Sequence, residues 1–207
     1  MAEVKRGRVL FLHGFFASGS CTPAVALREA MKERADVLSP DLPLHPAEAL
    51  KFIEGVIESE RPDVIVGNSN GAFLAQIVAK ETGLPALLGN PHFAMTSFLS
   101  ERIGRHEYKA PRQDGRQEIV IDQTLIDEFG AIQAHQFEGI TASARERVWG
   151  IFGEQDKVAH FEPMFLEHYE RAHHFPGGHT PTAEETARWY APLAEQLLSL
   201  AQVTKNQ

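Results

Sequence analysis

Hydrophobic residues are distributed along the chain in two patterns that alternate from one end to the other. Short, nearly continuous apolar runs are separated by longer segments in which apolar residues recur every third or fourth position. Continuous runs are typical of strands buried on both faces, and the longer period is typical of helices that cover a sheet. The alternation therefore predicts an α/β fold, with a mostly parallel sheet that carries helices on both faces.

About six apolar runs are predicted to form the strands of this sheet. Each run is short and ends close to a glycine or a proline, as expected where a strand gives way to a loop. The predicted strands are Val9–Leu12, 35–43, 63–67, 85–91, 147–153 and 172–178.

Helices are predicted in the segments between and after these runs. The first begins with Thr22 as its N-cap and Pro23 in the first helical position, and it extends to about Arg34. The others are a helix with Leu50, Ile53 and Ile57 on one face, a helix over 71–82 with Gly83 as its C-cap, a helix over about 160–171, and a C-terminal helix from about Thr182 that Pro192 is expected to kink or restart.

The segment between the fourth and fifth predicted strands is too long for a simple crossover. It extends from Pro91 to Glu146. Residues 117–122 alternate weakly between polar and apolar, and apolar residues from Leu125 to Ile132 repeat at helical spacing. We interpret residues 91–146 as a cap or flap that is inserted into a single α/β domain spanning residues 1–207.

Charge and cysteine content restrict the classes of partner. The chain has 207 residues, a formal net charge of −8 and one cysteine, Cys21. The excess of negative charge disfavours nucleic acid and anionic membrane as main partners. A lone cysteine forms no internal disulfide, and the N-terminal apolar run Val9–Leu12 is too short for a signal peptide or a membrane span. We expect a cytoplasmic protein with a small-molecule partner, and these features leave the oligomeric state open.

Reactive side chains follow four of the predicted strands. His13 follows the first strand, Ser69 the third, Asp156 the fifth and His179 the sixth. Ligands of an open parallel sheet bind beyond the carboxyl ends of the strands, so these residues are predicted to share one edge. The order serine, acid, histidine along the chain is that of the α/β-hydrolases.

Ser69 lies at the centre of a Gly-x-Ser-x-Gly motif between a predicted strand and a predicted helix. Gly67 and Gly71 are expected where the backbones come too close for a Cβ atom. The turn would lift Ser69 Oγ above the sheet, beside a helix N-terminus that favours negative charge. The backbone N–H groups of Asn70 and Phe15 are the predicted donors to an oxyanion.

A serine hydroxyl becomes a good nucleophile only when a base takes its proton. His179, on a Gly-Gly loop, is the predicted base, and Asp156 is predicted to orient its imidazole. Glu154 is the alternative acid, although it lies closer to the preceding strand. His13 is expected to hold the loop that shapes the oxyanion hole rather than to act as a second base. The plainer alternative is that Ser69 is a turn residue and His179 a surface histidine.

These segments together resemble the small α/β-hydrolase esterases of the YqiA type, over nearly the whole chain. The matching segments are LFLHGFFASG (10–19), GNSNGAF (67–73), NPHF (90–93), GEQDKV (153–158) and GGHTP (177–181). The resemblance implies a triad of Ser69, His179 and Asp156 that hydrolyses short- to medium-chain esters or thioesters, without a metal or an organic cofactor. Such turns often place Leu-Gly or a second glycine after the serine, whereas Asn70 here would add a polar side chain to the pocket.

Three further features could carry chemistry of their own. His173 and His174 are neighbours on a predicted strand and point to opposite faces, so no metal site is predicted from them. Cys21 lies near a helix start, where a thiolate would be favoured, but a small buried filler is the plainer interpretation. Phe16 and Phe93 follow strand ends and are predicted to line the substrate pocket, although aromatic residues there are also common in a core.

The predicted flap is locally basic in an acidic protein. Between Glu101 and Arg116 it holds five basic and three acidic residues, so its local charge is 5 − 3 = +2. This favours either an ordinary solvated flap or attraction of a phosphate-bearing acyl carrier such as coenzyme A. The predicted function is that of a serine carboxylesterase. The alternatives are an acyl-CoA thioesterase and a non-catalytic binding protein on a hydrolase scaffold.

Overall fold

A parallel sheet forms the centre of the protein in the computed structural model, which describes residues 6–205. Its six strands lie in the order β2-β1-β3-β4-β7-β8, and every neighbouring pair is parallel. The strands are β1 (Gly7–Leu12), β2 (Ala35–Leu38), β3 (Val64–Asn68), β4 (Ala86–Gly89), β7 (Val148–Gly153) and β8 (Arg171–Phe175). The predicted mostly parallel α/β sheet is confirmed.

Alternate residues of each central strand enter two separate cores, because successive side chains leave a strand on opposite faces. In β1, Val9 and Phe11 belong to one core, while Leu10 and Leu12 belong to the other. All four side chains are fully buried. A strand that is covered on both faces needs apolar residues at every position, which explains why the runs in the sequence are continuous.

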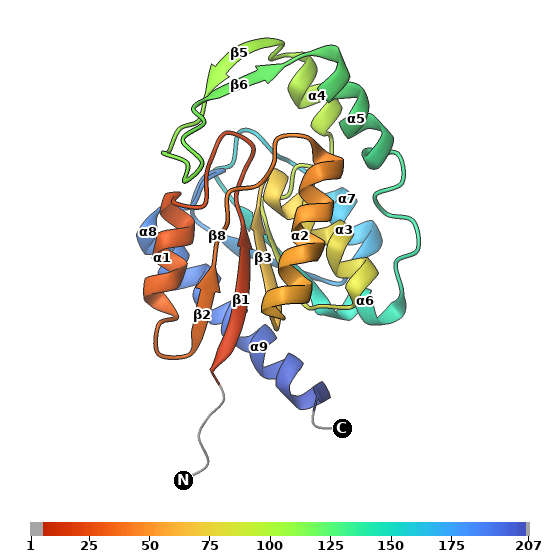
Figure 1. Ribbon diagram of the computed structural model, residues 1–207. Helices are drawn as coiled ribbons and strands as arrows, with labels where there is room; N and C mark the ends of the chain where they lie inside the picture. The colour runs from red at the N-terminus through yellow and green to blue at the C-terminus, as the bar shows by residue number, and fades with distance from the viewer. Residues whose placement is uncertain (1–5, 206–207) are drawn as a thin grey trace.

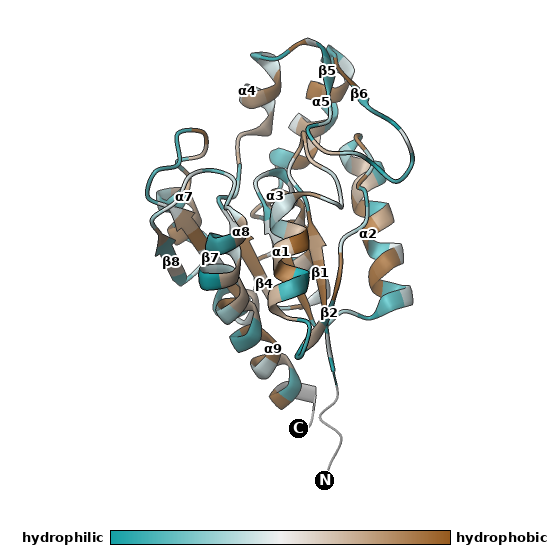
Figure 2. Cartoon of the chain, turned by 90° about the vertical axis from the view of Figure 1, so that its left-hand side faces the viewer, coloured by the Kyte–Doolittle hydropathy of each residue, from teal (hydrophilic) through white to brown (hydrophobic). Residues whose placement is uncertain are grey.

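Helices cover both faces of the sheet (Figure 1). Apolar residues of α1 and α9 complete the core that contains Val9, and those of α2, α3 and α7 complete the core that contains Leu10. Figure 2 shows the central strands in hydrophobic colours and polar residues on the outer surfaces of these helices. The helices are α1 (Thr22–Ala30), α2 (Pro46–Glu60), α3 (Asn70–Thr82), α7 (Glu162–His168) and α9 (Ala191–Lys205).

Several helix ends differ from the sequence prediction. The N-cap of α1 is Cys21, not Thr22, because Thr22 already has helical geometry, and Cys21 makes no side-chain capping bond. The helix ends at Ala30, and the chain then turns into β2 instead of remaining helical to Arg34. Helix α7 is likewise shorter than predicted. By contrast, α3 ends at Gly83 as predicted, with φ at 73° in the left-handed region that glycine adopts easily.

The C-terminal helical segment changes its winding before Pro192. It consists of α8 (Ala183–Glu185), a π-helical turn labelled η1 (Thr186–Tyr190), and α9. The wider turn lies where the ring of Pro192 would otherwise crowd the carbonyl of Arg188. The irregularity expected at this proline therefore falls in the turn before it.

Within residues 6–205, no helix has both the length and the apolar character that crossing a membrane requires.

The chain between β4 and β7 forms a cap beyond the carboxyl ends of the strands (Figure 1). The weak alternation at 117–122 corresponds to a strand of an antiparallel hairpin, and the helical spacing after it corresponds to a helix. The cap elements are α4 (Met95–Ser100), β5 (Gly104–Glu107), β6 (Glu118–Ile121) and α5 (Gln123–Gln133), and α6 (Ala142–Arg147) returns the chain to the sheet.

A buried polar network joins α3 to the chain that leaves the cap. Gln76 of α3 is fully buried. Its Nε2 donates to the carbonyl of Gln136 at 2.7 Å, and its Oε1 accepts from the hydroxyl of Tyr169 at 2.7 Å. These groups are shielded from water, so removing one partner leaves the others unsatisfied.

We predict that Gln76→Leu lowers the free energy of unfolding by about 2 kcal/mol, because the Tyr169 hydroxyl and the Gln136 carbonyl both lose their partner. Urea denaturation measures this change. Glu81→Leu, at an exposed position of the same helix, is the control and should change stability little. A Gln76→Leu protein as stable as the wild type would contradict this role.

Candidate active site

The carboxyl ends of the parallel strands bring the reactive residues together. His13 follows β1, Ser69 follows β3, Asp156 follows β7 and His179 follows β8. Parallel strands end at the same edge of the sheet, and in this protein the cap covers that edge (Figure 1). Ser69 and His179 are 110 positions apart in the chain and make direct contact.

The turn at Ser69 is tight and strained. Ser69 has φ 57° and ψ −119°, a conformation that residues with a Cβ atom seldom adopt. A Cβ atom on Gly67 would lie 2.4 Å from the carbonyl oxygen of Gly71, and one on Gly71 would lie 2.0 Å from the carbonyl oxygen of Leu12. Both glycines are therefore required by close backbone approach, as the motif predicted.

A chain of hydrogen bonds links the serine, the histidine and the acid. Ser69 Oγ lies 2.8 Å from His179 Nε2, and His179 Nδ1 lies 2.8 Å from Asp156 Oδ2. Glu154 is exposed, and its carboxylate makes no hydrogen bond to the imidazole. The structure thus brings Asp156, rather than Glu154, to the histidine.

Asp156 is a buried carboxylate whose hydrogen bonds keep it ionised. Its Oδ1 accepts from the N–H groups of Val158 and Ala159 at 2.7 and 3.1 Å. Burial by itself raises the pKa of Asp156, but the hydrogen bonds from His179 and from these two amides outweigh it and leave the pKa below its usual value. The carboxylate can therefore hold the imidazole with Nε2 facing the serine.

Asn90 fixes the backbone of the loop that carries His179, and the sequence analysis missed it. Its Nδ2 donates to the carbonyls of Gly178 and His179, both at 2.9 Å. Its Oδ1 accepts from the N–H of Gly153 at the end of β7. Asn90 is buried and has φ 41°, in the left-handed region.

Asn68 supports the same loop from the neighbouring strand. Its Nδ2 donates to the carbonyl of His179 at 3.3 Å, and its Oδ1 accepts from the hydroxyl of Tyr190 at 3.3 Å. The signal that could have identified both asparagines is the repeated Gly-Asn pair: residues 67–68 end β3, and in residues 89–90 the glycine ends β4 and the asparagine follows it.

The two predicted oxyanion donors lie beside the serine. The N–H of Asn70 is at the first position of α3, where a helix supplies no partner. Phe15 follows Gly14, which lies so close that a Cβ atom there would be 3.5 Å from Ser69 Cβ. Within the described part of the chain, neither N–H donates to another residue. Both are free to bind an oxyanion at Ser69.

His13 holds the loop beside Ser69, as expected. Its Nε2 accepts from the N–H of Leu42 at 2.9 Å, so in the neutral ring the proton is on Nδ1, which donates to the carbonyl of Gly14 at 2.8 Å. Burial lowers the pKa of His13 to about 4 and keeps the ring neutral. This ring is a structural support and not a second base.

Ser69 and His179 open into a cavity of about 370 Å³ whose wall is mostly apolar. Phe16 lines this cavity, as predicted, and Cys21 lies in its wall, where burial raises the pKa of the thiol. The lining residues are Phe11, Gly14, Phe15, Phe16, Ala17, Cys21, Thr22, Pro23, Asn68, Ser69, Phe98, Arg102, Lys109, Ala110, Val158, His179 and Thr180.

Two side chains predicted to face the substrate lie elsewhere. Phe93 is 1% exposed and packs edge-on against Phe137 and Phe161, with ring centroids 5.0 and 6.0 Å away. It therefore belongs to the core, because aromatic rings on the chain leaving the cap and before α7 enclose it. Asn70 is also buried and does not line the cavity. The expected polar contribution of its side chain to the pocket is wrong.

The residues that line the cavity include two cations and no carboxylate. The guanidinium of Arg102 lies 4.0 Å above the ring of Phe98 and donates to the Glu101 carboxylate at 3.2 Å. The ammonium of Lys109 lies 6.0 Å from the centroid of the Phe16 ring and makes no ion pair with a described residue. The cavity is therefore aromatic with positive charge at its wall.

His92 is a second buried histidine that the sequence analysis did not single out. It borders a separate cavity of about 300 Å³, and its ring packs edge-on against Phe98 and Phe161 at 4.9 and 5.0 Å. Burial, followed by the proximity of His179, lowers the pKa of His92 to about 4. The ring is therefore neutral at physiological pH.

The histidines of β8 do not form a metal site. His173 lies against the ring of Trp149, while His174 pairs with Glu162, on opposite faces of the sheet. Among residues 6–205, no group of three or more His, Cys, Asp or Glu side chains is arranged to hold a metal ion.

We predict that His92→Phe makes protein stability less sensitive to acid. The unfolded chain binds a proton at His92 below about pH 6.5, and the folded protein binds one only below about pH 4. The free energy of unfolding therefore decreases as the pH is lowered from about 6.5 to about 4. Phenylalanine cannot bind a proton, so it removes this contribution to the pH dependence of stability while keeping the aromatic contacts. Melting temperatures from pH 7 to pH 4 test this, with exposed His135→Phe as the control. Parallel curves for wild type and His92→Phe would contradict it.

Comparison with solved structures shows the same fold in several proteins. Est1E from Butyrivibrio proteoclasticus aligns with a TM-score of 0.71 at 15% identity, over 95% of this chain and 90% of that one. Alpha/beta hydrolase domain-containing protein 10 from mouse aligns with a TM-score of 0.67 at 12% identity, over 95% and 91%. A monoacylglycerol lipase from Paleococcus ferrophilus aligns with a TM-score of 0.66 at 17% identity, over 93% and 94%.

These likenesses identify the architecture as the α/β-hydrolase fold. The sequence also matches a family model over residues 8–174, which is most of the chain. The protein therefore belongs to the uncharacterised protein family UPF0227, a YqiA-like family of α/β-hydrolase fold.

Proposed function

We propose that this protein is a serine hydrolase that cleaves carboxylic esters of small to medium acyl chains. One observation carries the proposal: Ser69 Oγ, His179 and Asp156 form an unbroken hydrogen-bond chain with 2.8 Å at each link. In addition, the chain shares its fold with a monoacylglycerol lipase from Paleococcus ferrophilus. A turn residue and a surface histidine would have no reason to meet with a buried carboxylate behind them.

In the first half of the proposed reaction, Ser69 Oγ attacks the ester carbonyl carbon while His179 Nε2 takes its proton. The carbonyl oxygen becomes an oxyanion that accepts from the N–H groups of Phe15 and Asn70. The bond between this carbon and the alkoxy oxygen then breaks. His179 gives its proton to that oxygen, and the alcohol leaves an acyl group on Ser69.

In the second half, water replaces the alcohol. His179 takes a proton from water, which attacks the acyl carbon and forms a second oxyanion at the same two N–H groups. The bond to Ser69 Oγ breaks, and the serine recovers its proton from His179. The carboxylate of Asp156 stabilises the imidazolium in both halves and stays ionised.

The cavity beside Ser69 supports the proposed acyl specificity. Its volume of about 370 Å³ is near the small end of the range for small-molecule sites. The rings of Phe15, Phe16 and Phe98 offer an apolar wall to an acyl chain. This size favours short and medium chains over long ones.

An acyl-CoA thioesterase is the second candidate, and the cations of the cavity favour it. Arg102 and Lys109 line the same cavity as Ser69, and no carboxylate does. In a protein of net charge −8, this local positive charge suits a leaving group that carries phosphates. A non-catalytic binding protein remains the alternative from another class.

We predict that Ser69→Ala reduces hydrolysis of p-nitrophenyl acetate by about 10³-fold or more, because the nucleophile is lost. Asp156→Asn should cause a comparable loss through misorientation of His179. Rates are compared after thermal unfolding shows that each variant is folded.

A fluorophosphonate probe supplies the control for this prediction. Wild-type protein should be labelled at Ser69, and the alanine variant should not be labelled. Full activity of Ser69→Ala would show that the assignment is wrong. A folded wild-type protein that the probe fails to label would instead favour the binding protein.

We predict that added salt distinguishes the two enzymatic candidates. If Arg102 and Lys109 attract coenzyme A, then kcat/KM for acyl-CoA falls as salt rises, while kcat/KM for a neutral ester stays nearly constant. The double variant Arg102→Gln/Lys109→Gln should remove the salt dependence. Lys51→Gln, at an exposed position of α2, is the control. Equal salt dependence for both substrates would argue against the thioesterase.

A further inference from the structure

A nearly buried arginine fastens the cap to the loops beside the active site. Arg112 lies in the connection between β5 and β6, and its side chain is 4% exposed. It donates to both carboxylate oxygens of Asp114 at 3.1 and 2.9 Å, and through Nη1 to the carbonyl of Leu42 at 3.1 Å. The ring of Tyr108 lies 4.5 Å from its guanidinium carbon. With each of its three nitrogens donating one hydrogen bond, the guanidinium holds the connection in one place.

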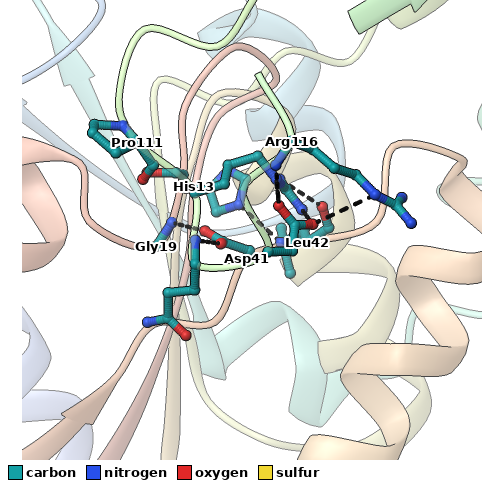
Figure 3. A network of polar contacts seen from close by, with 10 residues as sticks. His13, Gly19, Asp41, Leu42, Pro111 and Arg116 are labelled. Carbon is teal, nitrogen blue, oxygen red and sulfur yellow. Dashed lines mark hydrogen bonds and ion pairs between the residues drawn. The ribbon is translucent and has the colours of Figure 1, made fainter. Parts of the chain in front are cut away.

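Further hydrogen bonds attach the same part of the cap to the chain below it (Figure 3). The carboxylate of Asp41 accepts from the N–H of Gly19 at 2.7 Å and from the N–H of Gln113 at 2.5 Å. The hydroxyl of Ser18 donates to the carbonyl of Pro111 at 2.9 Å. The loop after β1, the loop after β2 and the cap are therefore joined at one point.

From Arg112 the contacts lead to the peptide group between Gly14 and Phe15. Leu42 accepts from Arg112 through its carbonyl and donates through its N–H to His13 Nε2 at 2.9 Å. His13 Nδ1 donates in turn to the carbonyl of Gly14 at 2.8 Å. Figure 3 shows His13 and Leu42 side by side beneath the cap connection. The Gly14 carbonyl belongs to the same peptide group as the N–H of Phe15, the proposed oxyanion donor.

Hydrogen bonds to the carbonyl of a peptide group act on its N–H as well. The group is planar, so holding the carbonyl sets the direction of the N–H. A bonded carbonyl also polarises the group and makes the N–H a stronger donor. The Gly14 carbonyl accepts a second bond from the N–H of Ala17 at 3.0 Å, within its own loop. Among the hydrogen bonds that this peptide group makes with described residues, the one from His13 leads toward the cap, while the next carbonyl, that of Phe16, accepts directly from the N–H of Lys109 at 2.8 Å.

We propose that Arg112 is a positioning residue for the oxyanion hole. It acts through Leu42 and His13 to keep the Gly14–Phe15 peptide group oriented with its N–H toward the oxyanion. The cap connection is thereby part of the catalytic geometry as well as a cover. This inference rests on the proposed serine hydrolase function.

The test is Arg112→Gln, assayed with p-nitrophenyl acetate. We expect kcat to fall about tenfold, less than the roughly 10²- to 10³-fold that follows loss of a whole oxyanion donor, with KM nearly unchanged. Affinity for a trifluoromethyl ketone, whose serine adduct carries an oxyanion, should fall by a similar factor. Affinity for an amide of the same acyl chain, which forms no oxyanion, should stay constant.

Arg116→Gln is the matched control. Arg116 lies in the same connection, 3.9 Å from the same Asp114 carboxylate, but its side chain is 81% exposed and makes no hydrogen bond to Leu42. Wild-type kinetics are expected for this variant. Arg112→Lys keeps a donor for the Leu42 carbonyl and should retain part of the lost activity.

A double-mutant cycle tests the route through His13. If both residues act on the same peptide group, Arg112→Gln combined with His13→Gln is no slower than His13→Gln alone. Additive losses would overturn the proposal. If Arg112→Gln does not fold, Asp114→Asn provides a second test, because it weakens the hydrogen bonds that hold the Arg112 guanidinium and lies at an exposed position. This variant should lower kcat by a smaller factor and leave KM unchanged.

Two other results would overturn the inference: unchanged kcat in Arg112→Gln, or an equal loss of affinity for the ketone and the amide, which would show that Arg112 only maintains the cavity. Failure of the proposed function is distinguishable, because wild-type protein would then neither hydrolyse esters nor react with a fluorophosphonate. If the wild type is active and Ser69→Ala is inactive, the proposed function holds, and the Arg112 results then test only the positioning role of Arg112.

Discussion

The close approach of α3 to the end of β1 is the constraint on which the site depends. Gly71 has no side chain, and its backbone lies where a Cβ atom would be 2.0 Å from the carbonyl oxygen of Leu12. This contact forces Ser69 into a strained conformation above the sheet edge and brings Gly14 beside it. A larger residue at Gly71 would separate the helix from the strand, and with it the proposed nucleophile, Ser69, from the loop of Phe15.

Around this turn, most polar residues hold other groups in place. Asn90 connects the end of β7 to the loop of His179, and the amides of Val158 and Ala159 keep Asp156 ionised. Buried polar groups are stable only when their partners are present, so each of these contacts restricts the geometry of its neighbour. The proposed role of Arg112 extends the same principle to the cap.

Burial keeps two histidines near the active site, His13 and His92, in their neutral form. Burial lowers the pKa of His13 and of His92 to about 4, so neither ring adds positive charge near the proposed triad at physiological pH. The cations near the cavity come instead from the cap, through Arg102 and Lys109. The negative charge is concentrated on Asp156, which faces the imidazole.

The sequence by itself determined the parallel sheet and the strand ends that carry Ser69, Asp156 and His179, because burial on both faces and tight turns leave local patterns of apolar residues and glycines. Only the tertiary structure decided which aromatic side chains line the cavity. Phe16 and Phe93 look alike in sequence, but one borders the cavity and the other is enclosed by rings from distant segments. The roles of Asn90 and Arg112 likewise arise from contacts between residues far apart in the chain, which no local pattern records.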